Sequence, residues 1–267
     1  MTMGGMTVHR LFAVLLLLLV SVPPLQAAEP LAGWSPLGPP CQASLAGNGD
    51  LTLTDGRRLH LAGIELAHRP IGERSAKPWP LAAQARQLLA ELTGGPLTLY
   101  ADGTDTDRYG RWPVQAVTGD GRWLQGELLR QGLARVATTP DSRAAIRPLL
   151  AAEAPAREAK LGLWAERETA LRAPDQLLRW LDSVQVVEGR VTSAALVKGA
   201  VYLNFGEDWR RMLAVRLPKP LLAQTALDPL GWSGRRLRVR GWIGKGIGPL
   251  IEVSHMEQIE VLEGDPP

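Results

Sequence analysis

The chain has 267 residues, of which 45% are hydrophobic and 21% are charged, so it carries enough apolar side chain to bury a core. This composition excludes an intrinsically disordered polypeptide. The formal net charge of +3 excludes a protein that coats polyanions over its whole surface, so any site for phosphate or nucleic acid must be a local patch. The single cysteine, Cys41, excludes an internal disulfide framework, and we expect its thiol to be buried.

The N-terminal residues 1–27 have the layout of a secretory signal peptide. Met1–Arg10 carries a positive charge, an apolar run follows at Leu11–Val22, and Ala27 and Ala28 offer a cleavage site. The run is shorter than the about 20 residues that a membrane helix needs, and no second run follows it. The sequence therefore predicts a periplasmic or secreted protein with no integral membrane segment after cleavage. A retained membrane anchor is the alternative.

The next part of the chain predicts a Pro/Gly-rich leader at residues 28–41 and then a small β-barrel with packed helices at residues 42–166. Alternating apolar residues indicate strands, apolar residues at helical spacing indicate helices, and glycines end them. The predicted elements are a β-hairpin over Leu51–Leu61 with its turn at Asp55-Gly56, a helix at Pro80–Leu92, strands at Pro96–Tyr100 and Trp112–Val117, and helices at Leu124–Gln131 and Ser142–Leu161.

A second domain is predicted at residues 183–264, after a helical linker at residues 167–182. Its sequence pattern predicts strands almost throughout, interrupted by a short apolar segment at Pro220–Leu230. The predicted strands are Val184–Val191, Val201–Phe205, Met212–Leu217, Leu237–Ile243 and Leu250–Val253. Five short strands with one interposed helix are typical of a small β-barrel, of which the OB-fold is the commonest type.

Several motifs occur in an order and spacing that point to a known family. They are Gly47–Leu53 followed by Asp55–Glu65, Asp107–Arg111 (DRYGR), Leu128–Ala134 (LLRQGLA) and Glu153–Trp164 (EAPAREAKLGLW). Together they resemble thermonuclease (staphylococcal-nuclease-like) domains. The strings Tyr202–Trp209, Arg235–Trp242 and Gly248–Val253 resemble the OB-like module that follows such domains in some exported bacterial proteins. The resemblance implies a mainly β fold with α-helices (α+β), an OB-type five-stranded barrel followed by a second small OB-like barrel.

The resemblance also implies a site for phosphodiester hydrolysis. Enzymes of this family hold Ca²⁺ with two Asp carboxylates, activate water with a Glu, and neutralise the phosphate with two Arg side chains. In this chain the metal-ligand positions are Asp50 and Glu65. The two arginine positions are His60 and Arg111, and the general-base position is His68.

The substitutions at these positions indicate a degenerate catalytic centre. Glu65 is one methylene longer than Asp, which disturbs the cage of about 6–8 oxygens that Ca²⁺ requires. A histidine at the first arginine position, His60, is mostly neutral at neutral pH and lacks the bidentate fork of a guanidinium. Arg111 has a structural alternative, an ion pair with Asp107 or Glu65. We therefore expect a weak or inactive enzyme that binds nucleic acid or a protein partner, with Ca²⁺ implied only by the resemblance and no other cofactor.

Three other hypotheses stay open. The chain is an active metal-dependent phosphodiesterase that uses Asp50, Glu65, His68 and Arg111. Alternatively, His60 and His68 join the two carboxylates in a transition-metal cluster. The third hypothesis is a structural periplasmic interaction module.

One strand of the second domain suggests a further nucleic-acid site. Alternate residues of a strand share a face, and here three guanidinium groups and an indole would form a groove for a single-stranded backbone and a stacked base. The residues of this predicted groove are Arg236, Arg238, Arg240 and Trp242. The alternative is a solvated face on which Glu252 and Glu260 pair with the arginines.

Overall fold

The computed structural model describes residues 31, 33–47, 49–67, 80–103, 105–138, 145–224 and 227–262. The predicted signal peptide at residues 1–27 and the predicted base His68 lie outside the described residues, so export stays a prediction. None of the helices in the described part of the chain is long and apolar enough to span a bilayer.

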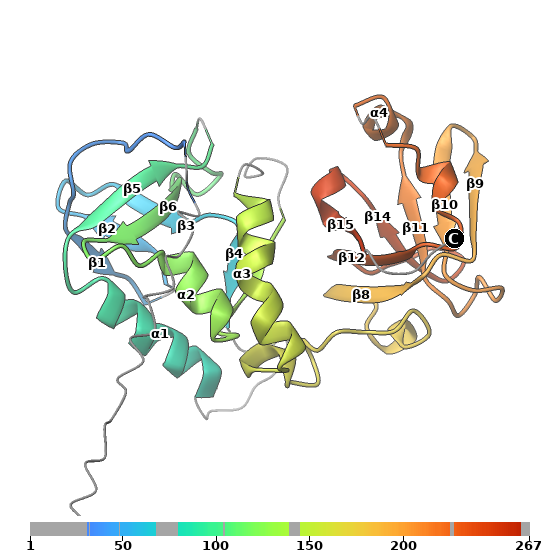
Figure 1. Ribbon diagram of the computed structural model, residues 1–267, viewed down its shortest axis with the longest axis horizontal. Helices are drawn as coiled ribbons and strands as arrows, with labels where there is room; N and C mark the ends of the chain where they lie inside the picture. The colour runs from blue at the N-terminus through green and yellow to red at the C-terminus, as the bar shows by residue number, and fades with distance from the viewer. Residues whose placement is uncertain are drawn as a thin grey trace, which may run out of the picture.

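The N-terminal unit, residues 31–165, is built on a curled five-stranded sheet that forms a half-barrel (Figure 1). In sheet order its strands are β1 (Ala43–Leu45), β2 (Leu51–Leu53), β3 (Arg58–Leu61), β6 (Trp112–Thr118) and β5 (Leu97–Ala101). Strands β3 and β6 are parallel, whereas the other neighbours are antiparallel. A separate antiparallel pair consists of β4 (Ile64–Leu66) and β7 (Ala134–Val136). This topology agrees with the predicted mainly β fold of the barrel type.

The core of this unit follows from the alternation seen in the sequence. Leu51 on β2 and Leu59 and Leu61 on β3 are buried, whereas the residues between them are more exposed. The helices α1 (Pro80–Leu92), α2 (Leu124–Arg130) and α3 (Ile146–Glu158) carry apolar side chains into the same core. The predicted hairpin, the first helix and the short second helix are therefore confirmed.

One glycine ends a helix as the sequence predicts, and a second lies against it. Gly132 follows α2 with φ of +66°, the left-handed region that favours glycine. The helix predicted over Ser142–Leu161 ends earlier than expected, at Glu158, where Lys160 takes the left-handed conformation with φ of +51°, and Gly162, with φ of +53°, begins the next short turn. The N–H of Leu163 donates to the Gly132 carbonyl at 2.8 Å, so the two helix ends pack backbone to backbone. A β-carbon at Gly132 would lie 2.4 Å from the carbonyl oxygen of Leu161, which leaves no room for a side chain.

Cys41 is half-buried rather than fully buried. Its backbone pairs with Leu97 in an isolated bridge, and its thiol points at the Leu97 carbonyl oxygen at 3.7 Å. Burial raises the pKa of the thiol above its usual value, which disfavours the reactive thiolate.

The segment that connects the two units differs from the helical linker predicted at residues 167–182. It consists of turns and one short 3₁₀ helix, η2 (Leu177–Arg179). The physical reason lies at two residues. Arg172 pairs with the next strand, because its N–H donates to the Val186 carbonyl at 3.0 Å, and Pro174 has no N–H to continue a helix.

The C-terminal unit, residues 183–262, contains two sheets around a second core. One sheet has the order β13 (Gly244–Lys245), β14 (Pro249–Glu252), β11 (Ala214–Leu217), β10 (Ala200–Asn204) and β9 (Ser193–Val197). The other has the order β15 (Ile259–Val261), β12 (Arg236–Trp242) and β8 (Val184–Arg190). Short helical turns lie at α4 (Lys219–Leu222), η3 (Pro229–Trp232) and η4 (Met256–Gln258), and the first two correspond to the predicted apolar segment.

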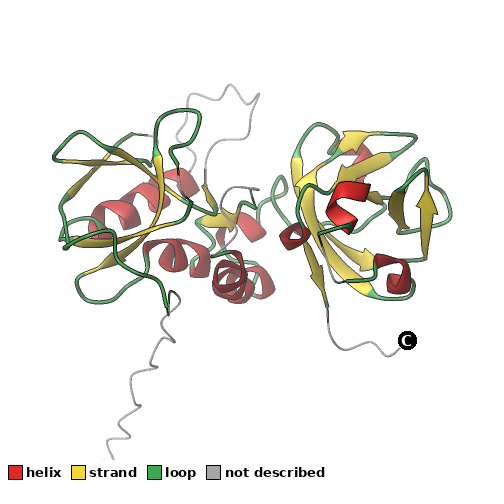
Figure 2. Ribbon diagram, turned by 90° about the horizontal axis from the view of Figure 1, so that it is seen from above, coloured by secondary structure: helices red, strands yellow, loops and turns green. Residues whose placement is uncertain are grey.

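The two units meet where β8 and β12 face α3 and its C-terminal turn, η1 (Gly162–Trp164) (Figures 1 and 2). Val186 of β8 packs in a small buried cluster with Ala156 of α3 and Trp164 of η1. A buried ion pair joins Arg240 of β12 to Glu153 of α3 at 2.9 Å. Apolar packing and a buried charge pair therefore hold the C-terminal unit against the N-terminal one.

Candidate functional site

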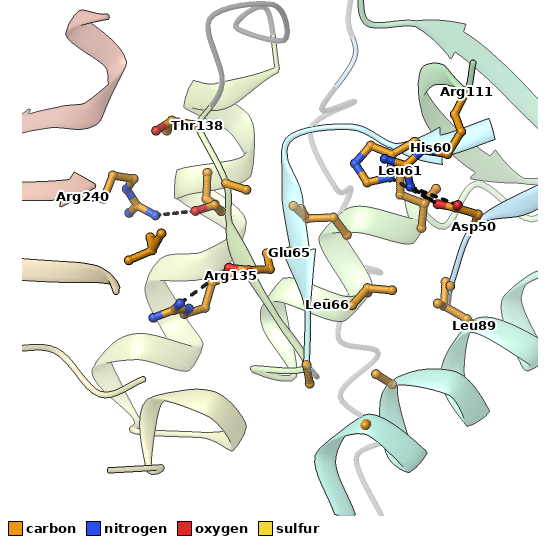
Figure 3. A pocket seen from close by; sticks show the side chains of 18 of the residues that line it. Asp50, His60, Leu61, Glu65, Leu66, Leu89, Arg111, Arg135, Thr138 and Arg240 are labelled. Atoms are coloured by element: carbon orange, nitrogen blue, oxygen red, sulfur yellow. Dashed lines mark hydrogen bonds and ion pairs between the residues drawn. The ribbon is translucent and has the colours of Figure 1, made fainter. Parts of the chain in front are cut away.

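The centre of the candidate site is the point where three neighbouring segments of the half-barrel converge. Asp50 directly precedes β2, His60 lies on β3, and Arg111 directly precedes β6. Since β2 and β6 both pair with β3, the sheet topology brings these three residues together from positions far apart in the chain. Figure 3 shows their side chains at one end of a pocket.

Arg111 is the hub of this group and binds two carboxylates. Its Nη1 donates to both oxygens of Asp50, at 2.8 and 3.0 Å. Its Nε donates to Asp107 at 2.8 Å, and its Nη2 lies 2.7 Å from the same carboxylate oxygen. Burial would lower the pKa of Arg111, but its hydrogen bonds to these carboxylates raise it overall. The guanidinium of Arg111 is therefore permanently charged and is paired with two carboxylates.

Asp107 is presented by a tight turn that its own side chain stabilises. Its Oδ1 accepts hydrogen bonds from the N–H groups of Tyr109 and Arg111, both at 2.9 Å. Burial would raise the pKa of this carboxyl, but the hydrogen bonds from Arg111 and Tyr109 hold it below its usual value. The expected ion pair between Arg111 and Asp107 is present, and Arg111 pairs in addition with Asp50.

His60 lies beside the same carboxylate, with its Nδ1 3.4 Å from Oδ1 of Asp50. Burial lowers the pKa of His60, and the positive charge of Arg111 lowers it further, whereas the contact with Asp50 offsets only part of this shift. His60 is therefore neutral at pH 7 and does not supply the second positive charge that a developing phosphate charge would need.

Glu65, the second predicted metal ligand, is directed elsewhere. Strand β4 pairs with β7 so that Glu65 lies opposite Arg135, and their charged groups approach to 3.6 Å. Figure 3 shows this pair apart from the group around Asp50. The structure thus brings Asp50, His60 and Arg111 together and places Glu65 with a different cation.

Asp50, His60, Glu65 and Arg111 line one cleft of about 860 Å³ that continues to the C-terminal unit. Sequence reasoning missed three of its arginines: Arg86 on α1, Arg108 in the turn before Arg111, and Arg135 on β7. Arg108 stands inside the DRYGR motif and could have been found there. The other two reach the cleft only through helix and strand packing, for which the sequence carries no signal.

Comparison with known protein families finds a match to one part of the chain. A family model described as a staphylococcal nuclease homologue matches residues 58–166, which include His60, Glu65 and Arg111. Residues 58–166 form a staphylococcal-nuclease-like domain. No curated protein matches the chain. The resemblance predicted from the motifs is confirmed for this nuclease-like domain, while Asp50 and the C-terminal unit lie outside the matched residues.

Nucleases of this family depend in general on Ca²⁺, but the described residues of this nuclease-like domain do not fit that ion. Both oxygens of Asp50 accept hydrogen bonds from Arg111, and Glu65 lies against Arg135. Among the residues that the structure describes, no group of three or more His, Cys, Asp or Glu side chains could hold a metal. A Ca²⁺ ion needs about 6–8 oxygen ligands, so this arrangement supplies too few.

The predicted groove on β12 is occupied by carboxylates. Two glutamates show that its three arginines share a face. Glu188 pairs with Arg236 and Arg238, and Glu260 pairs with Arg238 and Arg240. Arg240 is only 2% exposed and turns toward the nuclease-like domain.

The other predicted partner of this face, Glu252, pairs instead with Arg216 of β11. On β12 only Arg236 and Trp242 remain well exposed at the surface. Nucleic-acid contact through this strand stays a prediction that rests on these two side chains.

Proposed function

We propose that the chain is an exported nuclease-family protein with a degenerate catalytic centre, which binds nucleic acid without a metal ion and does not cleave it. The observation that carries this proposal is the double pairing of Arg111 with Asp50 and Asp107. A hydrolase of this type needs one carboxylate for the metal and a guanidinium for the phosphate. Pairing Arg111 with Asp50 withdraws both groups from those roles.

The charges around the cleft support binding. Arg86 and Arg108 line it and have no carboxylate partner in the described part of the chain. Arg86 donates to the Gly47 carbonyl, and Arg108 lies 5.0 Å from the ring of Tyr109, so both are held at the surface of the cleft. Two guanidinium groups with no carboxylate partner among the described residues suit the phosphates of a nucleic-acid backbone, which such contacts bind without sequence preference.

Cleavage is tested with the mature protein and end-labelled single-stranded DNA, single-stranded RNA and duplex DNA. Each substrate is incubated with Ca²⁺, Mn²⁺, Zn²⁺ or a chelator. We expect no cleavage above background in any condition. Turnover comparable to that of an intact thermonuclease would overturn the proposal in favour of an active metal-dependent phosphodiesterase.

Binding is tested by fluorescence anisotropy over a range of salt concentrations. We expect the affinity to be the same with Ca²⁺ and with chelator, and to fall with a log–log slope of about −0.7 for each phosphate contacted in a single strand. The substitution Arg108→Ala should reduce the slope by about 0.7. Arg210→Ala is the matched control, because Arg210 is an exposed arginine that does not line the cleft. If the protein does not bind nucleic acid at low salt, the proposed binding function is wrong, and the hypothesis of a structural interaction module is favoured instead.

A further inference from the structure

The cleft extends beyond the nuclease-like domain onto the C-terminal unit. Figure 3 shows Arg111 at one end of the cleft and Arg240 at the other, with Glu65 and Arg135 between them. On the C-terminal unit, the lining of the cleft also includes Trp242 of β12 and Val184, its neighbour on β8. The two ends of the cleft therefore come from different units and differ in chemistry.

Trp242 is an exposed indole on a firmly held strand. It is 54% exposed, although large apolar side chains usually gain free energy by burial. Two residues earlier, Arg240 donates to the Val136 carbonyl at 3.1 Å and to the Glu153 carboxylate at 2.9 Å. These bonds tie β12 to β7 and α3 of the nuclease-like domain, so Trp242 has a fixed place at the cleft.

The charges along the cleft identify the class of ligand. Arg86 and Arg108 have no carboxylate partner among the described residues, whereas Arg111, Arg135 and Arg240 are each paired with one. The two cations on the nuclease-like domain attract an anionic backbone, and the exposed aromatic face on the C-terminal unit attracts a planar, unpaired base. Single-stranded nucleic acid carries both features, whereas the bases of a continuous duplex are stacked on one another.

We infer that Trp242 is a base-stacking platform, by which the C-terminal unit completes a binding cleft for single-stranded nucleic acid that the nuclease-like domain begins. This inference rests on the proposed binding function. It assigns the contact to the indole, while the neighbouring arginine Arg240 positions the strand through Glu153. Because the cations and the indole come from different units, we expect that only a ligand of several nucleotides contacts both.

The test measures binding of labelled single strands to the full mature chain and to Trp242→Ala. For a strand of about 12 nucleotides, within the range that one OB-type site covers, we expect the variant to bind about 5- to 150-fold more weakly. For a dinucleotide, which we expect not to contact the cations and the indole together, the same substitution should change the affinity less than twofold. Trp242→Phe keeps an aromatic face and should recover most of the affinity for the longer strand.

Trp209→Ala is the matched control, because the Trp209 indole is 63% exposed but does not line the cleft. It should leave the affinity unchanged. If Arg108→Ala weakens binding of the longer strand while Trp242→Ala does not, the stacking inference is wrong and the proposed function stands. If the unsubstituted protein binds no strand of any length, the proposed function fails and the inference fails with it. If Trp242→Ala weakens the binding of a duplex of the same length by the same factor, the inferred preference for single strands is wrong.

Discussion

The ion pair between Glu153 and Arg240 should be the most costly polar contact to break between the two units. Glu153 is fully buried on α3 and accepts four hydrogen bonds. Its Oε1 accepts from the Val136 N–H at 2.6 Å, and its Oε2 accepts from Arg240 at 2.9 Å and from Arg157 at 3.1 Å. Substituting Glu153 by Ala removes all of these contacts at once.

The loss of stability in Glu153→Ala can be estimated from the buried polar groups that lose their partner. Without Glu153, the buried guanidinium of Arg240 keeps only the Val136 carbonyl and Glu260 as partners, and the Val136 N–H loses its acceptor. Removing one member of a buried ion pair costs about 3–5 kcal/mol, because the remaining charge stays desolvated. For a protein of this size, such a loss corresponds to a fall in Tm on the order of 10 °C.

The free energy of unfolding is measured by urea denaturation for the parent chain and for Glu153→Ala. Glu252→Ala is the control, because it breaks an ion pair with Arg216 at the surface and should cost about 0–1 kcal/mol. Glu153→Gln keeps an acceptor for the Val136 N–H and should fall between the two. A loss for Glu153→Ala no larger than that for Glu252→Ala would refute the view that a buried charge pair holds the units together.

Two further predictions concern the N-terminal unit. Because burial and Arg111 lower the pKa of His60, the unfolded chain binds more protons there than the folded protein below about pH 6.5, so stability should fall as the pH drops through that range. His60→Gln should flatten this decline in urea denaturation between about pH 7.5 and 5, and an unchanged slope would contradict the assignment. Gly132→Ala should cost on the order of 3 kcal/mol, because the new β-carbon meets the Leu161 carbonyl, whereas Gly121→Ala, with φ of +86° and open space, should cost about 1–2 kcal/mol. Equal losses of thermal stability in these two variants would show that only backbone strain matters.

The sequence predicts the elements whose signals are local. The hairpin over Leu51–Leu61 and the helix Pro80–Leu92 could be identified because their apolar spacing and their turn residues lie within a few positions of each other. Short strands with weak local signals were missed, among them Ser193–Val197, which gains its hydrogen bonds only by pairing with β10. The linker at residues 167–182 is predicted to be helical from its composition. It does not form a helix, because the backbone of Arg172 pairs with β8 instead.

Some residues of the candidate site could also be identified from the sequence, whereas others could not. The resemblance to the nuclease family pointed to Asp50, His60 and Arg111 as members of one site, and the structure brings them together. Asp107, one of two carboxylates expected as a partner of Arg111, is its partner through a local turn. Period-two alternation alone placed Arg236, Arg238 and Arg240 on one face of a strand.

Only the tertiary structure decided which charges meet. It paired Glu65 with Arg135 and buried Arg240 against Glu153, two residues that are 87 positions apart. Side-chain periodicity determines the face on which a residue lies, but the partner of a charged group depends on which distant element covers that face. The same packing made Arg240 an interdomain contact and left the neighbouring indole, Trp242, exposed in the cleft.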